Sequence, residues 1–226
     1  MKVTDRQRTR RRLLPEMEGR TARWYARNRG SAAQRAEYRT QAAALTERLP
    51  DEARVLEVAP GPGYLAIEIA RRGRYHVTGV DISRTMVEIA RENARQAGVH
   101  VDFQQGDAAR LPFDADSFDL IVCQAAFKNF TQPVAALDDM QRVLRRGGTT
   151  VIHDLRRDAS AADIDQAVRG MGLGPLNSFV VKGTLSWLRR RAATAAHFTG
   201  LVSESAFHTC DIRSDGISME VYLKKV

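Results

Sequence analysis

The chain has 226 residues, of which 43% are hydrophobic and 27% charged, a composition typical of an ordinary globular protein. This composition excludes collagen-like, mucin-like and disordered chains, and no stretch approaches the ~18 consecutive apolar residues of a membrane-spanning helix. The N-terminus is basic but lacks the apolar segment of a secretory signal. We therefore expect a cytoplasmic protein without membrane insertion.

The net charge of +8 is concentrated near the N-terminus. Residues 1–39 contain twelve Lys and Arg against four Asp and Glu, whereas residues 40–226 contain 23 of each. We predict a basic N-terminal arm with a possible lid over residues 1–30, disordered in its first 15 residues, and a single domain over residues 31–226. Such an arm could bind an acidic partner, nucleic acid or a membrane surface, or could be a solvated tail.

Helix and strand patterns alternate along the body of the chain. A short helix is expected around Trp24, and Ser31 can cap a longer helix that ends at Pro50. Further strands are predicted at 54–58, 75–80, 99–105, 118–124 and 149–153, with helices at 64–71, 83–97 and 133–145. This alternation predicts parallel strands with helices on both faces of the sheet.

The C-terminal third departs from this alternation. Residues 156–206 contain two helical patterns, which we interpret as a helical cap or insertion. Strand patterns at 207–213 and 217–223 flank Ser214-Asp215-Gly216, a typical hairpin linker. The last two of seven strands are therefore expected to be antiparallel.

A glycine-containing turn joins the first strand to its helix. Gly61 and Gly63 allow the backbone to approach a ligand, and the helix N-terminus offers free N–H donors. Asp81 ends the next strand and can accept hydrogen bonds from ribose hydroxyls. These features alone also fit the fingerprint of NAD-binding proteins. That pattern is Gly-x-Gly-x-x-Gly or Ala followed by an acidic residue, and Gly61, Gly63 and Ala66 match its three fixed positions.

A third feature favours a different cofactor. Asp107 follows the third strand, where it can accept from an adenine amino group while Ala108 packs on the ring. Together these motifs resemble the class I S-adenosylmethionine-dependent methyltransferases, and more narrowly the type 11 branch that includes ubiquinone/menaquinone C-methyltransferases. The segments that carry the resemblance are 57–63, 80–83, 106–112, 118–122 and 143–148, within about residues 40–155.

The resemblance implies a Rossmann-like three-layer α/β sandwich, S-adenosylmethionine as cofactor and methyl transfer to a small-molecule acceptor. It implies that Glu57, Gly61 and Gly63 frame the methionine part and that Gln124 faces the sulfonium. Asp81 would take the ribose, Ile82 would lie against the adenine, and Asp107 and Ala108 would hold its edge. Tyr25 would cover the cofactor, as N-terminal aromatic residues do in similar enzymes.

One position departs from the family pattern. Ala59 stands where the family usually has glycine, and its methyl group is expected to fit if the residue keeps a negative φ. The catalytic candidates are His153, Lys128 and Asn129, at the ends of the fourth and fifth strands. Imidazole ionises near neutral pH and suits a general base, Lys128 could orient an acidic substrate or act as a base if desolvated, and Asn129 could hold a hydroxyl or carbonyl group.

Three alternatives remain open at this stage. They are a nucleic-acid methyltransferase, an NAD-dependent dehydrogenase, and a protein that uses S-adenosylmethionine for non-methylating chemistry. A homodimer is a possible assembly, and no metal site is expected. The strand order that the resemblance implies would place two other strands between those of Cys123 and Cys210, a distance too great for a disulfide.

Overall fold

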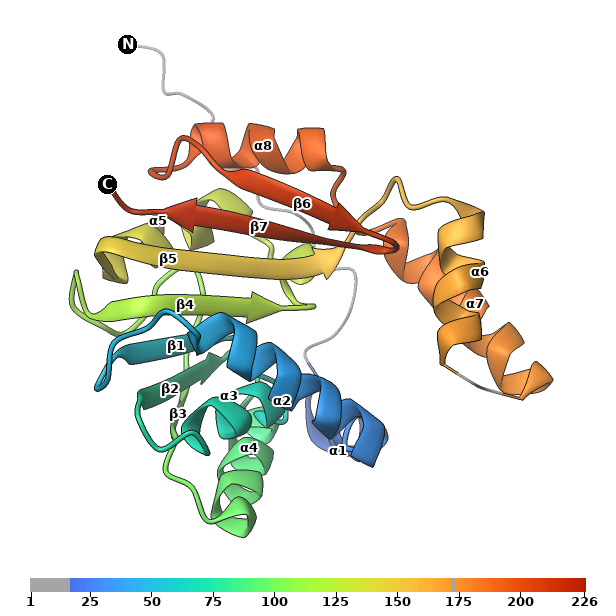
Figure 1. Cartoon of the computed structure of the whole chain (residues 1–226), viewed down its shortest axis with the longest axis horizontal. Coiled ribbons are helices and arrows are strands. Elements are labelled where there is room, and N and C mark those ends of the chain that lie inside the picture. The colour runs from blue at the N-terminus through green and yellow to red at the C-terminus, as the bar shows by residue number, and fades with distance from the viewer. Residues whose placement is uncertain (1–16, 172–173) are drawn as a thin grey trace.

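A seven-stranded sheet lies between two layers of helices in the computed structural model, which describes residues 17–171 and 174–226 (Figure 1). The strand order is β3-β2-β1-β4-β5-β7-β6. The first five strands pair in parallel, whereas β7 runs antiparallel to both β5 and β6. The Rossmann-like sandwich with an antiparallel C-terminal hairpin is therefore confirmed. The disorder expected of residues 1–15 lies outside the described residues.

The elements have the following bounds. The strands are β1 (Arg54–Val58), β2 (His76–Asp81), β3 (Asp102–Gln105), β4 (Phe118–Gln124), β5 (Leu144–Leu155), β6 (Asp211–Asp215) and β7 (Ser218–Lys224). The helices are α1 (Gly19–Asn28), α2 (Ala32–Thr46), α3 (Tyr64–Ala70), α4 (Arg84–Ala97), α5 (Pro133–Val143), α6 (Ala161–Gly170), α7 (Pro175–Arg189) and α8 (Ala195–Glu204), with a 3-10 turn, η1 (Phe127–Asn129). Among the described residues, no helix is both long enough and apolar enough to cross a membrane.

Local sequence signals explain where several helices begin and end. Ser31 accepts a hydrogen bond from the Gln34 N–H while the Gln34 side chain returns to Ser31, a capping box that starts α2. The Ser83 hydroxyl caps α4 by accepting from the Met86 N–H, at 3.0 Å, without a return bond. Gly98 then ends α4 with a φ of +67°, as the sequence predicted.

Some boundaries differ from the sequence prediction because of strand pairing. The helix expected at 133–145 ends at Val143, since Leu144 pairs with Phe118 and belongs to β5. β5 extends to Leu155 because it pairs with β7 along this length. The third strand begins only at Asp102.

The C-terminal third also differs in detail. It contains three helices where the sequence predicted two, because Thr194 caps a separate helix, α8, after α7 ends. β6 starts at Asp211, later than expected. The hairpin turn is Gly216-Ile217, since Asp215 pairs with Ser218 and Gly216 takes a φ of +48°.

Buried apolar side chains form one cluster on each face of the sheet. Val55, Leu120 and Val122 pack with α2, α3 and α4, whereas Ile121 and Ile152 pack with α5 and α8. Successive strand side chains alternate between faces, so Glu57, Gln124 and His153 share the face covered by α2 to α4. Asp154 lies on the opposite face.

The two cysteines are both free. Cys123 is buried in β4, and Cys210 is partly buried just before β6. β5 and β7 separate these strands, which confirms the expected spacing.

Candidate functional site

The turn after β1 adopts left-handed backbone conformations at alternate residues. Ala59 has a φ of +58°, Gly61 of +54° and Gly63 of +79°. Ala59 therefore does not keep the negative φ on which the expected fit of its methyl group depended. The Ala59 N–H donates to the Val80 carbonyl, at 2.7 Å, which continues the pairing of β1 with β2 by one residue. The chain then leaves the sheet at once. An L-residue pays about 1 kcal/mol for this conformation, so the turn is strained at its first residue.

Gly61 and Gly63 serve different purposes. A Cβ on Gly63 would lie 2.6 Å from the Phe103 ring, so this glycine permits close packing of α3 on the sheet. A Cβ on Gly61 would meet no atom within 4 Å among the described residues. Open space beside a left-handed glycine at a helix N-terminus leaves room for a ligand to approach the backbone.

Glu57 lies beneath this turn and is almost completely buried. Its Oε2 accepts a hydrogen bond from the Ala66 N–H, at 2.8 Å. Burial raises the pKa of Glu57 to about 8, and the nearby charge of Asp81 adds to the effect. A positive charge placed beside Glu57 would therefore lower its pKa and favour the ionised form.

Asp81 ends β2 with its carboxylate turned to the glycine turn. Oδ2 accepts from the Gly61 N–H and Oδ1 from the Ser83 N–H, each at 2.9 Å. Burial raises the pKa of Asp81, and these two hydrogen bonds oppose the rise. Each carboxylate oxygen can accept a further bond, which a ligand hydroxyl could donate.

The predicted adenine-side residues lie at the neighbouring strand ends. Ile82 is 38% exposed directly after Asp81. Asp107 is exposed after β3, its Oδ1 accepting from the Ala109 N–H at 3.0 Å, and Ala108 is half-buried. The structure thus leaves an apolar surface and a carboxylate available at this edge.

The N-terminal helices contribute a second group of side chains. Tyr25 is half-buried, with the Arg29 guanidinium 5.6 Å from its ring centre, whereas Trp24 is 66% exposed. Burial raises the pKa of Tyr38, the charge of Arg29 opposes the rise, and Tyr25 and Glu57 add to it. Arg29 and Tyr38 were not anticipated, because no sequence motif connects them to residues after β1.

Gln124, at the end of β4, carries an unpaired acceptor. Its Nε2 donates to Gln41 Oε1 on α2, at 2.8 Å. Its Oε1 is buried and has no hydrogen-bond partner among the described residues. Leaving such an atom unpaired is costly, so a ligand donor at this point would be favoured. Gln41 was also missed, since it reaches the site only through tertiary packing.

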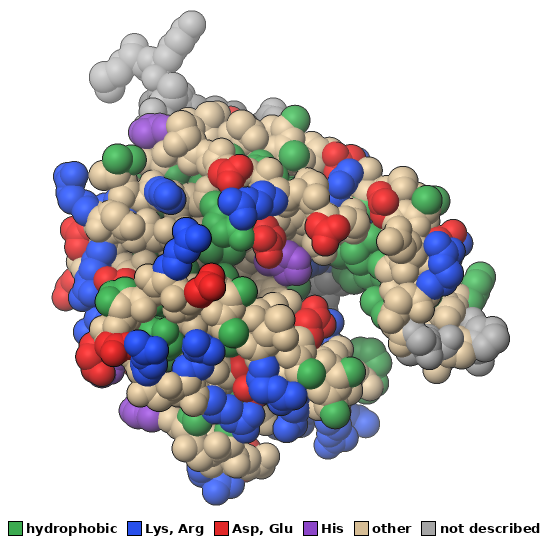
Figure 2. All heavy atoms as spheres, in the orientation of Figure 1, with side chains coloured by type: hydrophobic (Ala, Val, Ile, Leu, Met, Phe, Trp, Pro, Cys, Tyr) green, Lys and Arg blue, Asp and Glu red, His purple; other side chains and the backbone are tan. Residues whose placement is uncertain are grey.

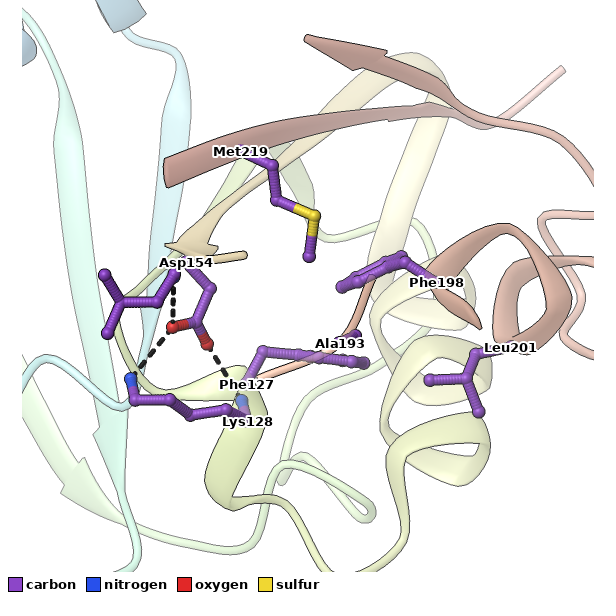
Figure 3. Close-up of a pocket in the computed structure, with 8 residues that line it drawn as sticks. Phe127, Lys128, Asp154, Ala193, Phe198, Leu201 and Met219 are labelled. Atoms are coloured by element: carbon purple, nitrogen blue, oxygen red, sulfur yellow. Dashed lines mark hydrogen bonds and ion pairs between the residues drawn. The ribbon is translucent and has the colours of Figure 1, made fainter. Parts of the chain in front are cut away.

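Lys128 lies in a buried ion pair (Figure 3). Its Nζ is 2.8 Å from Asp154 Oδ1, and the two side chains are 6% and 4% exposed. The Lys128 N–H donates to Asp154 Oδ2, and its Nζ also donates to the Ala125 carbonyl. The carboxylate therefore balances the charge that was expected to orient an acidic substrate, and the pair fixes η1 to β5.

The other two catalytic candidates are His153, on β5, and Asn129, in η1. His153 is half-buried and pairs in register with Gln124 on one side and Glu220 on the other. The imidazole therefore shares a sheet face with the unpaired amide oxygen of Gln124. Asn129 is exposed at the end of η1.

Residues 55–148 match a family model described as a methyltransferase domain. The demethylmenaquinone methyltransferase of Deinococcus radiodurans is 38% identical over 108 residues, which cover 47% of this chain and 45% of that protein. The ubiquinone/menaquinone biosynthesis C-methyltransferase of Rhizobium meliloti is 36% identical over 114 residues, 49% and 44% of the two chains. The chain thus spans less than half the length of these curated relatives.

Solved structures share the fold over more of the chain. A SAM-dependent methyltransferase from Aquifex aeolicus superposes with a TM-score of 0.69 at 16% identity, over 90% of this chain and 98% of that one. The [4+2]-cyclase SpnF matches 58% of this chain and 49% of its own at 29% identity, with a TM-score of 0.53. The resemblance seen in the sequence is therefore confirmed: residues 55–148 match a methyltransferase domain, and the chain is similar in sequence to quinone methyltransferases and in fold to S-adenosylmethionine-dependent methyltransferases.

Proposed function

We propose that the chain transfers a methyl group from S-adenosylmethionine to a small-molecule acceptor in the cytoplasm. One observation carries the proposal. The open space at Gly61, the Asp81 carboxylate and the unpaired Gln124 oxygen all lie at the carboxyl ends of neighbouring strands, where open α/β sheets bind their ligands.

The polar and apolar side chains at these strand ends suit the chemical groups of this cofactor. Asp81 would accept from the ribose hydroxyls, with Ile82 and Ala108 against the adenine and Asp107 at its edge. Glu57 and Gly61 would border the methionine part, covered by Tyr25, with Gln124 toward the sulfonium. When bound, the cofactor supplies a methyl group that is already electrophilic, so the protein's task is to align the acceptor and remove its proton.

Binding of S-adenosylhomocysteine, measured by isothermal titration calorimetry, tests the cofactor assignment. Asp81→Ala should weaken binding about ten- to a hundredfold, because the ribose hydroxyls lose their acceptor. Asp102→Ala is the matched control, since Asp102 is an exposed carboxylate at the opposite end of the sheet. Binding of NAD without S-adenosylhomocysteine would overturn the proposal.

The acceptor is less constrained than the cofactor. The family model ends at residue 148, before the 156–206 segment and the hairpin, so it does not cover the part of the fold expected to bind the acceptor. Because relatives are named for demethylmenaquinone, a reduced demethylmenaquinone is a suitable probe acceptor.

We assign proton removal from the acceptor to His153, with Asn129 as a polar contact. His153→Ala should lower turnover of the probe about 10²- to 10⁴-fold while S-adenosylhomocysteine affinity is kept. Lys128→Met is the contrasting variant: it leaves Asp154 buried and unpaired, so it should lower stability by about 3–5 kcal/mol. A turnover change below about threefold in His153→Ala would remove histidine from the mechanism.

A further inference from the structure

The α6–α7 hairpin stands apart from the body of the molecule. It follows β5 directly and projects from the carboxyl ends of the strands, with α7 packed against α6 (Figure 1). In the space-filling view it forms a separate lobe at one side (Figure 2). Its outer surface is therefore free of contact with the sheet.

That outer surface is apolar. Phe179 is 78% exposed, Val180 57% and Trp187 48%. At 100° per residue these three positions fall within an arc of about 100° on α7, so they form one ridge. Val181 and Leu188, on other sides of the helix, are half-buried. Large apolar side chains clustered on one exposed face mark an interaction surface.

The charged residues of α7, and of the segment that follows it up to residue 203, are all basic. Residues 166–203 contain five Lys and Arg and no Asp or Glu. Arg190 is exposed and lies on the same side of α7 as the ridge, and the Arg191 guanidinium is 5.7 Å from the Trp187 ring centre. Lys182 is paired with Asp165 of α6. The ridge is thus flanked by cations without intervening acidic residues on α7.

We propose that the outer face of α7 docks on an anionic lipid bilayer, with Phe179, Val180 and Trp187 at the interface. Helices that lie on membranes combine aromatic and aliphatic side chains on one face with Lys and Arg beside them. Anionic lipids attract such cations over about a Debye length. A second copy of this chain fits less well, because a two-fold contact through this face would bring Arg190 and Arg191 toward their own copies.

The α6–α7 hairpin lies at the carboxyl edge of the sheet (Figure 1). α6 begins shortly after β5, whose end carries His153 and Asp154. The candidate site and the docking face therefore lie at the same end of the molecule. The docking proposal does not depend on which acceptor is methylated.

Tryptophan fluorescence tests the proposal, because the chain has two tryptophans. In Trp24→Phe, Trp187 is the only reporter, and its emission should shift to the blue with vesicles of phosphatidylcholine and phosphatidylglycerol. The shift should shrink as salt is added. In Trp187→Phe, Trp24 should report no shift with the same vesicles.

Vesicle co-sedimentation gives an independent readout. The double variant Phe179→Ser, Val180→Ser should bind these vesicles at least about tenfold more weakly, while the exposed control Trp24→Ser should bind as the wild type does. Wild-type binding by the double variant would overturn the proposal, as would a shift reported by Trp24 and not by Trp187. A blue shift that appears without vesicles as protein concentration rises would point to a second copy instead and would also overturn it.

Discussion

Glu57 is a carboxyl group held where ionisation is costly. Burial raises its pKa to about 8, against about 4.5 in the unfolded chain. Between these two values the folded protein keeps a proton that the unfolded chain has lost. The contribution of Glu57 to the free energy of unfolding must therefore fall as pH rises through this window, because the folded state binds one more proton than the unfolded chain.

Glu57→Gln should remove this contribution while keeping an acceptor for the Ala66 N–H. Relative to the variant, the wild type should lose up to about 1.4 kcal/mol of unfolding free energy per pH unit between pH ~4.5 and ~8. Below that window the difference should be constant. Urea unfolding of both proteins across this range measures it.

Glu92→Gln provides the control for surface carboxylates. Hydrogen bonds from Arg95 and Gln96 lower the pKa of Glu92 to about 2, so its titration falls below the window. Its pH profile should follow that of the wild type from pH ~5 to ~8. Parallel profiles for Glu57→Gln and the wild type would show that Glu57 is ionised in the folded protein.

Residues with a local signal could be predicted, and residues placed by tertiary packing could not. Asp81 and Gly61 follow from their positions at a strand end and a turn. Arg29 follows α1 and Gln41 lies on α2, and only the packing of these helices brings Arg29 near Tyr38 and Gln41 near Gln124. The left-handed φ of Ala59 was missed because a side chain type does not state its backbone angle.

At the level of elements, regular interiors were predicted better than ends. The strand expected at 118–124 is β4, Phe118–Gln124, and the helix expected at 83–97 is α4, which begins one residue later at Arg84 because Ser83 is its cap. β5 was predicted too short, because its ends are fixed by pairing with β4 and β7. A strand's length depends on partners that its own sequence does not display.

The Lys128–Asp154 pair shows the same dependence between elements. Lys128 belongs to η1 and Asp154 to β5, so neither segment alone predicts a buried ion pair. The Lys128 Nζ also donates a hydrogen bond to the carbonyl of Ala125, the residue directly after Gln124. Since Ala125 has a φ of +56°, the ion pair sustains a strained turn next to the candidate site. We therefore assign Lys128 a positioning role.

On the scale of the whole molecule, α1 is attached to the body at both ends. Glu18 accepts hydrogen bonds from the Arg84 and Thr85 N–H groups at the start of α4, at 2.8 and 3.1 Å. The Tyr64 hydroxyl donates to the Ala26 carbonyl, at 3.1 Å. These contacts hold α1, which carries Tyr25, against the start of α4 and against Tyr64, the first residue of α3. The basic N-terminal segment thus includes a part that is built into the domain.

We propose that residues 1–30 divide into a dispensable segment and a lid. Deletion of residues 1–12 should leave S-adenosylhomocysteine affinity within about twofold, since a charge run with few apolar residues contributes little to a packed site. Deletion through Gly30 also removes Tyr25 and Arg29, and should weaken binding about tenfold or more as water reaches the pocket. Glu18→Ala in the full chain should give an intermediate loss, because α1 remains but its tie to α4 is gone. Calorimetric titration of the three variants decides the matter, and equal losses from the short and long deletions would contradict this division.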